Sequence, residues 1–347
     1  MSKEIRSLYD RLLPAPRSGG FRMDGYWVWC GSVVKGEDGR FHMFASRWPK
    51  HLPMHPGWLV HSEVVRAVSD TPEGPYAFQE VVLPARGAEY WDGRSTHNPH
   101  IVRHGDTYVL YYMGSTHPLA DVLPEEGSAF GLSDARTIVA RANKRVGIAT
   151  AKSVFGPWER RDAPILPTRP GRFDSFLTSN PAPCIHGDGS VMLIYKARRY
   201  EGNVHGKMTL GAARAERFDG AYRVVSEEPV FPPDRFHLED PFVWHTGDRY
   251  ELIAKDMDGN LCGEAHAGIH AYSRDGLDWQ LGEHPKAYSR SITWDDGSVT
   301  TMGSFERPFL LFQDGKPTHL FAATADGPGG FARATQTWNM VVPIAPE

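Results

Sequence analysis

The chain has 347 residues, of which 41% are hydrophobic and 23% charged, so it holds enough apolar material for a sizeable core and is not expected to be disordered. Its 38 basic and 42 acidic residues leave a net charge of −4, which gives no basic excess for binding nucleic acid. The sequence contains no run of 18 apolar residues that would predict a membrane span, and its first residues lack the apolar core of a signal peptide. Its three cysteines lie far apart and predict no disulfide framework. We therefore expect a cytoplasmic protein.

The first expected element is a short amphipathic helix over residues 3–13, ahead of the main fold. Five β-hairpins follow, because five segments share one pattern: a short polar motif, an apolar run, a turn rich in Gly and Asp, and a second apolar run. They begin at Cys30 (CGSVVKGEDGRFHMFASRW), His97 (HNPHIVRHGDTYVLYYMGS), Ser179 (SNPAPCIHGDGSVMLIYKAR), Glu239 (EDPFVWHTGDRYELIAKDM) and Glu306 (ERPFLLFQDGKPTHLFAATAD).

A second hairpin is predicted after each of the first four. Each has an alternating apolar strand, then a turn, then an aromatic residue that opens the next strand, in the motifs GPY, GPW, GAY and GLDW. The final segment FARATQTWNMVVPI is expected to supply the outer strand of the fifth unit. The insert over residues 117–143 is polar with weak periodicity, which favours a loop over one face with a helical turn.

Two hairpins make a four-stranded sheet, and the repetition of such a sheet is typical of β-propeller blades. The spacing agrees, because the equivalent positions of the five units lie 68, 82, 60 and 67 residues apart, at Gly31, Pro99, Pro181, Pro241 and Pro308. We therefore predict an all-β fold, a single five-bladed β-propeller over residues 1–347 with a short N-terminal helix.

The polar motifs all precede first strands, which line the central channel of a propeller, so they should meet in one funnel. That funnel is the predicted site. The candidate catalytic carboxylates are Asp24, Asp92, Glu239 and Glu306. The candidate substrate-binding residues are Trp29, Arg47, Trp91, His97, Asn98, Asn180, Lys196, His237, Asp240 and Arg307. Paired carboxylates with separated pKa values are what cleavage of a glycosidic bond needs, and Trp and Tyr side chains can stack on sugar rings.

These residues also have structural interpretations. Asn98, Asn180 and Asp240 stand before proline, where such residues commonly cap turns. Arg307 could form an ion pair with Glu306 or with a neighbouring carboxylate. No HExxH or CxxC spacing supports a zinc site, and no G-x-G-x-x-G, P-loop or G-x-S-x-G motif is present.

The repeated motifs, with Glu-Asp-Pro in the fourth unit and GPY or GPW after the third strand, resemble the five-bladed glycoside hydrolases of family 43 and its relatives, families 32, 62, 68, 117 and 130. The resemblance covers roughly residues 24–344. It implies that Glu239 is the general acid. Nearby carboxylates and partial burial should raise the pKa of Glu239, and Glu239→Gln should lose most turnover. If it does not, His237 or Glu306 becomes the candidate acid. The position of the general base falls on Cys30, so Asp24 or Asp92 is the expected base.

The resemblance implies an enzyme that hydrolyses an oligosaccharide with inversion and without a cofactor, although relatives can hold a structural Ca²⁺ in the channel. Two alternatives stay open. A phosphorylase would need a cationic site for phosphate, for which Arg47, Lys196, Arg198 and Arg307 are available. The missing Asp at Cys30 would also suit a carbohydrate-binding propeller without catalysis. The sequence names neither the sugar nor the oligomeric state.

Overall fold

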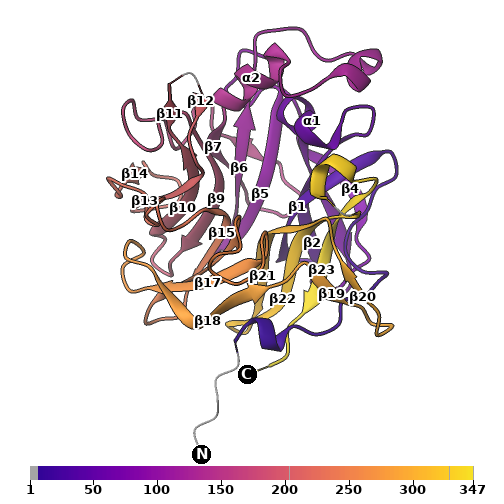
Figure 1. Cartoon of the computed structure of the whole chain (residues 1–347), viewed down its shortest axis with the longest axis vertical. Helices are drawn as coiled ribbons and strands as arrows, with labels where there is room; N and C mark the ends of the chain where they lie inside the picture. Colours follow the sequence, from indigo (N-terminus) through magenta and orange to yellow (C-terminus); the bar gives the residue numbers. More distant parts are fainter. Residues whose placement is uncertain (1–6, 203, 328, 347) are drawn as a thin grey trace, which may run out of the picture.

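The computed structural model describes residues 7–202, 204–327 and 329–346. It is mostly β, with 48% of residues in strands and 8% in helices, and its strands form a five-bladed β-propeller, as the repeats predict. The blades are antiparallel meanders arranged in a ring (Figure 1). Within the described part of the chain, no helix is long and apolar enough to cross a membrane.

Four blades have four strands and the fifth has three. Blade one is β1 (Tyr26–Lys35), β2 (Phe41–Pro49), β3 (Glu63–Ser69) and β4 (Ala77–Leu83). Blade two is β5 (Ser95–His104), β6 (Thr107–Ser115), β7 (Arg145–Ala151) and β8 (Glu159–Arg160). Blade three is β9 (Leu177–Ile185), β10 (Val191–Arg198), β13 (Thr209–Ala215) and β14 (Arg223–Val224). Blade four is β15 (Leu238–His245), β16 (Tyr250–Asp256), β17 (Gly268–Ser273) and β18 (Gln280–Tyr288), and blade five is β21 (Ser304–Gln313), β22 (Lys316–Ala325) and β23 (Thr337–Pro343).

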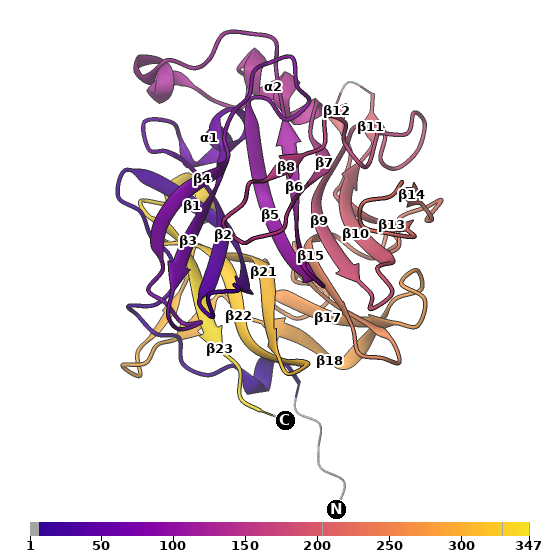
Figure 2. The same cartoon turned by 180° about the vertical axis from the view of Figure 1, so that it is seen from behind.

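Short elements connect the blades. Two small hairpins lie outside them, β11 (Tyr200–Glu201) with β12 (Val204–His205), and β19 (Ser291–Thr293) with β20 (Val299–Thr301). The helices are α1 (Met54–His61) and α2 (Ala135–Ala142), and the 3-10 turns are η1 (Tyr9–Arg11), η2 (Pro124–Ala129) and η3 (Gly330–Arg333). Helices α1 and α2 contact each other and lie together at the upper edge of the molecule in both views (Figures 1 and 2).

Glycine determines where each inner hairpin turns. The tip of the first hairpin in every blade carries a glycine with φ between 59° and 99°, a conformation that costs other residues steric strain. These glycines are Gly39, Gly105, Gly189, Gly247 and Gly315. The turn motifs in the sequence therefore predicted the five inner hairpins correctly.

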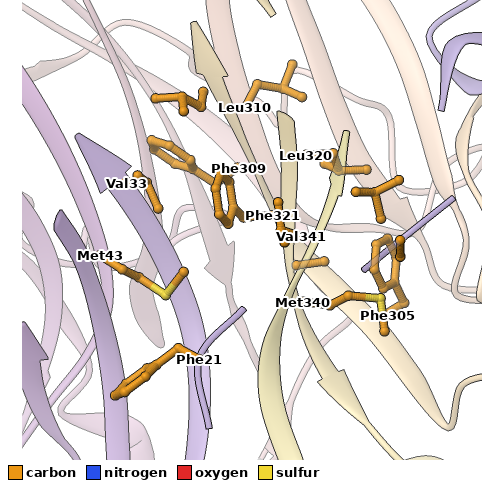
Figure 3. Close-up of a cluster of buried hydrophobic side chains, with 14 of the residues drawn as sticks. Phe21, Val33, Met43, Phe305, Phe309, Leu310, Leu320, Phe321, Met340 and Val341 are labelled. Carbon is orange, nitrogen blue, oxygen red and sulfur yellow. The ribbon is translucent and has the colours of Figure 1, made fainter. Parts of the chain in front are cut away.

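The segment before β1 joins the two ends of the chain. Leu12 pairs with Ile344 and Phe21 pairs with Asn339, so this segment lies against the strands of blade five before the chain enters blade one. Phe21 is buried in the largest apolar cluster, which blades one, four and five share (Figure 3). That cluster includes Val33, Met43, Phe305, Phe309, Leu310, Leu320, Phe321, Met340 and Val341. Burial of this apolar surface closes the ring.

The predicted N-terminal helix over residues 3–13 differs from the structure. Residues 3–6 lie outside the described residues, and the remainder forms only the turn η1 before Leu12 continues as extended chain. Pro14 and Pro16 follow closely, and a residue before proline is disfavoured in the helical conformation. The insert over 117–143 does contain a helix, α2, whereas the sequence did not predict α1.

Candidate active site

Each inner strand contributes one residue in a left-handed conformation. The five equivalent positions have φ between 50° and 56° and stand at a β-bulge between the first and second strands of the blade. They are Cys30, Asn98, Asn180, Asp240 and Arg307. Pro follows four of them, and because it lacks an N–H the ladder is interrupted there. Such backbone is uncommon for residues other than glycine and often marks functional sites.

These five side chains form a ring of hydrogen bonds, which we call the axial ring. The Cys30 thiol donates to Asn98 Oδ1 at 2.7 Å, and Asn98 Nδ2 donates to Asn180 Oδ1 at 2.8 Å. Asn180 Nδ2 donates to Asp240 Oδ1 at 2.6 Å, and Arg307 Nη1 donates to the same oxygen at 3.4 Å. The guanidinium of Arg307 also lies beside the Cys30 sulfur, so the ring is closed.

A cavity of about 540 Å³ opens above the axial ring, lined by residues from all five blades and from α1 and α2. Its aromatic side chains are Trp29, Trp48 and Trp58, of which Trp58 on α1 is the least buried. Trp58 stacks on His97, with 4.7 Å between ring centroids, and His97 Nδ1 lies 2.8 Å from Ser62 Oγ. The size, the aromatic wall and the polar floor suit a small ligand such as a sugar.

Two glutamates and two lysines occupy one side of the cavity. Lys255 Nζ lies 2.7 Å from Glu239 Oε2, 2.6 Å from Glu306 Oε2 and 3.5 Å from Asp240 Oδ2. Lys196 pairs with the other oxygen of Glu239. Glu239 is thus held by two ammonium groups, whereas Glu306 shares a single one with its neighbours.

These surroundings give the two glutamates opposite pKa shifts. Burial disfavours the ionised form of Glu239, but Lys196 and Lys255 outweigh it and hold the pKa of that carboxyl well below its ordinary value. Burial raises the pKa of Glu306 to about 7, and repulsion from Asp240 and Glu239 adds to the effect while Lys255 opposes it. The expected rise in the pKa of Glu239 is therefore wrong, because the sequence did not place the lysines beside it, and Glu306 has the raised value instead.

Most of the predicted substrate-binding residues do reach the cavity. These are Trp29, His97, Asn98, Asn180, Lys196, Asp240 and Arg307, together with the carboxylates Glu239 and Glu306. The repeated polar motifs made it possible to predict these positions, because equivalent strand ends in a propeller converge on one axis. Whether these residues bind substrate stays a prediction.

Asp24 and Arg47 lie away from the cavity. Asp24 is exposed on the segment before β1 and is not among the residues that line the cavity. Arg47 donates to Glu63 at 2.8 Å and is stacked between Tyr26 and Phe78, so its charge is used within blade one.

Asp92 and Trp91 are structural in blade two. Asp92 is buried and accepts hydrogen bonds from Arg86 Nε and from the Tyr112 hydroxyl, each at 2.7 Å. Trp91 stacks on Tyr112 and covers Gly147, where a Cβ atom would come within 2.3 Å of the indole ring. Both side chains are engaged by neighbouring strands, and neither lines the cavity.

His237 points to a neighbouring loop, where its Nδ1 lies 3.0 Å from Asp258 Oδ1. It does not line the cavity, although Glu239 two residues later does. Several cationic residues that do line the cavity were not predicted from the sequence, above all Arg141, Lys144 and Lys255. Arg141 belongs to the end of the insert and Lys144 follows the insert directly, and periodicity did not indicate that these side chains reach the cavity.

The residues at the axis do not suit the structural Ca²⁺ that the resemblance allows in the channel. Calcium prefers carboxylate and carbonyl oxygens, but Asp240 is the only carboxylate in the axial ring, and Arg307 and Lys255 already lie against its two oxygens. Among the residues that the structure describes, no group of three His, Cys, Asp or Glu side chains is arranged to hold a metal ion. We therefore assign no metal to this site.

No model of a known protein family matches the chain, and no curated protein matches it in sequence. Solved structures do match it. A family 117 glycoside hydrolase from the marine bacterium Zobellia galactanivorans superposes with a TM-score of 0.66 at 16% identity, over 96% of this chain and 89% of that chain. A thermostable family 43 glycoside hydrolase gives 0.60 at 12%, over 96% and 94%.

A third match is a family 43 β-xylosidase/α-arabinofuranosidase from a compost microbial metagenome, solved in complex with xylotriose. Its TM-score is 0.60 at 12% identity, over 96% of both chains. At these identities the likeness concerns the fold, because one scaffold can host different chemistries. The chain has the five-bladed β-propeller fold that these glycoside hydrolases share.

Proposed function

We propose that this protein is a glycoside hydrolase that cleaves an oligosaccharide in the axial cavity. The observation that supports this most is the pair formed by Glu239 and Glu306, two carboxyl groups on one wall of the cavity with opposite pKa shifts. Near neutral pH one is ionised and the other keeps a substantial protonated fraction. That is the division of roles that cleavage of a glycosidic bond requires.

In this proposal Glu306 is the general acid that protonates the leaving oxygen, and Glu239 is the ionised partner. This differs from the resemblance, which gives the acid role to Glu239. The reason is the position of Lys196 and Lys255, which favour the ionised form of Glu239. A general acid must carry a proton at the working pH, and Glu306 meets that condition better.

The separation of the pair bears on stereochemistry. Oxygens of both carboxylates lie within 2.7 Å of the same Lys255 nitrogen. These two oxygens are therefore at most about 5.3 Å apart, which is less than the about 6.5–9.5 Å that an inverting pair needs to place a water and agrees with the about 5 Å of a retaining pair. For this pair we propose retention in place of the inversion that family 43 implies, with Glu239 attacking the anomeric carbon and Glu306 later activating water.

The experiment is a screen of oligosaccharides with product analysis. Purified protein is incubated with a broad glycan panel at pH 6, and proton NMR follows the first-formed anomer of any product. We expect hydrolysis with retained configuration. Sugar binding without turnover across the panel would instead favour the non-catalytic binding propeller, and an inverted first product would exclude Glu239 as the nucleophile.

Phosphorolysis is the second candidate, because the cavity is rich in cations. Seven basic side chains line it, namely Arg141, Lys144, Lys196, Arg198, Lys255, Arg290 and Arg307, against the three carboxylates Glu239, Asp240 and Glu306. A phosphorylase would use some of them to hold phosphate. The same screen with and without inorganic phosphate separates the two reactions, since only phosphorolysis depends on it.

A further inference from the structure

Three of the cations in the cavity lack an acidic partner. Lys196 pairs with Glu239, Lys255 with Glu239 and Glu306, Arg307 with Asp240, and Arg290 reaches Glu264 at 4.0 Å. By contrast, Arg141, Lys144 and Arg198 form no ion pair with any carboxylate of the described residues. We call these three residues the cationic wall.

The cationic wall is assembled from distant parts of the chain. Arg141 stands in the last turn of α2, Lys144 lies between α2 and β7, and Arg198 ends β10. His205 on β12 links the two guanidinium groups, since its Nε2 lies 3.3 Å from Arg141 Nη1 and its ring also contacts Arg198. Burial, Arg198 and Arg141 all lower the pKa of His205, which favours the neutral imidazole, so the link between the two guanidinium groups adds no positive charge.

Lys144 is the most buried member, with 4% of its surface exposed. Its ammonium lies 5.1 Å from the centroid of the Trp58 ring, a cation–π contact that compensates only part of the lost hydration. Burial, and after it repulsion from Lys196 and Arg141, lowers the pKa of Lys144 well below its ordinary value. The lowered pKa expresses the cost of a buried ammonium without a counter-ion, and an anion bound in the cavity would favour the charged form of Lys144 and relieve this cost.

The cationic wall lies beside the proposed reacting groups. Lys196 and Arg198 are two residues apart on β10, so both side chains lie on the same face, about 7 Å apart along the strand. Lys196 holds Glu239. A group bound by Arg198 would therefore lie roughly one sugar ring away from the Glu239 carboxylate.

We infer that the cationic wall is a binding site for an oxyanion, either a carboxylate or sulfate group on the sugar chain or inorganic phosphate. Two guanidinium groups and one ammonium offer several donors to one small anion, and guanidinium donors match the geometry of carboxylate, sulfate and phosphate oxygens. The inference rests on the proposed function in one respect, namely that the ligand is a sugar chain. If the ligand is a sugar chain, the anion site predicts either an acidic glycan as the substrate or inorganic phosphate as a co-substrate.

The test measures binding by calorimetry, so it does not depend on turnover. The probes are oligosaccharides that contain uronic acids, each paired with its carboxyl-reduced form, together with sulfate and inorganic phosphate alone. We expect acidic members or free anions to bind at least about 10-fold more tightly than the neutral members. Arg198→Gln and Arg141→Gln should remove most of this preference.

Arg199→Gln is the matched control. Arg199 follows Arg198 directly, is exposed and pairs with Glu201, so the same change of charge there should leave anion binding unaltered. The inference would be overturned if acidic and neutral members bind with equal affinity and free anions do not bind. It would also be overturned if the Arg198 and Arg199 variants change anion binding equally. Phosphate binding that depends on Arg198, with turnover of neutral glycans only in phosphate, would identify the anion as phosphate.

Lys144→Met adds a readout that a purely structural lysine would not give. Removing an uncompensated buried charge should keep or raise the Tm of the ligand-free protein while anion affinity falls. A lower Tm with unchanged anion affinity would contradict the inference.

If anions bind as expected but no glycan is cleaved, the anion site at the cationic wall is supported and the proposed hydrolase activity fails. If neutral glycans are cleaved and no anion binds, the hydrolase activity stands and the anion site fails.

Discussion

The protonation states of Glu239 and Glu306 should be visible in the pH dependence of activity. Glu306 must be protonated to act as an acid, and its pKa is raised to about 7, so kcat/KM should fall as the pH rises through about 7. Glu239 must be ionised to act, and its pKa is lowered, so kcat/KM should not fall as the pH decreases to about 4.5. A pH–rate profile between pH 4 and 9 checks both limbs. A rise in kcat/KM through pH 7 would contradict the assignment.

Cys30 stands where the resembled family has its general base, but it is not suited to that role. Burial raises the pKa of its thiol well above the ordinary value, and the thiol donates to Asn98. Cys30→Ser keeps a donor at this position, so kcat should change by less than about 10-fold, whereas loss of a general base costs about 10²–10⁴-fold. Cys262→Ser, outside the cavity, is the control. A loss above 100-fold in Cys30→Ser alone would assign the thiol a chemical role.

The sequence predicted the funnel residues that belong to the repeated motifs, because repetition places equivalent residues at equivalent points. Glu239, Asp240, Glu306 and Arg307 were identified in this way. The sequence did not distinguish Asp92 from these funnel residues. Its carboxylate pairs with Arg86 inside blade two, and this contact can be recognised only in the folded structure. The pKa of Glu239 was predicted in the wrong direction for the same reason: pKa shifts depend on partners from other strands.

At the scale of elements, the segment before β1 stabilises the closed ring through Phe21. Phe21 is almost fully buried in the apolar cluster that blades one, four and five share. Phe21→Ala should lower the free energy of unfolding by about 3–5 kcal/mol, the usual cost of this change in a core. Chemical denaturation measures it. Phe155, which is 49% exposed, offers the control, and Phe155→Ala should cost much less. Equal effects would show that the N-terminal segment does not close the ring.

Hairpins were predictable because glycine and aspartate turns mark them locally. Helix α1 was not, because its sequence MHPGWLVH contains both proline and glycine, and packing rather than propensity stabilises it. For the insert, the sequence predicted a loop over one face with a helical turn, but not which side chains reach the cavity. As a result Trp58, Arg141 and Lys144, which the two helices and their flanks bring to the cavity, were not among the predicted site residues.

At the scale of the whole molecule, five blades each give one residue to the axial ring, and two helices cover part of one end. The fold is shared with glycoside hydrolases of low identity, so the fold alone does not determine the reaction. The proposed reaction therefore depends on the division of roles between Glu239 and Glu306 within the cavity.

The most direct test compares Glu306→Gln with Glu239→Gln on a natural oligosaccharide and on an activated aryl glycoside, after circular dichroism has confirmed folding. Loss of the acid should reduce kcat/KM about 10²–10⁴-fold on the natural substrate but little on the activated one, which needs no protonation. Glu239→Gln should lose activity on both. Full activity of Glu306→Gln on the natural substrate, or the reverse pattern between the two variants, would contradict the proposed roles of the two glutamates.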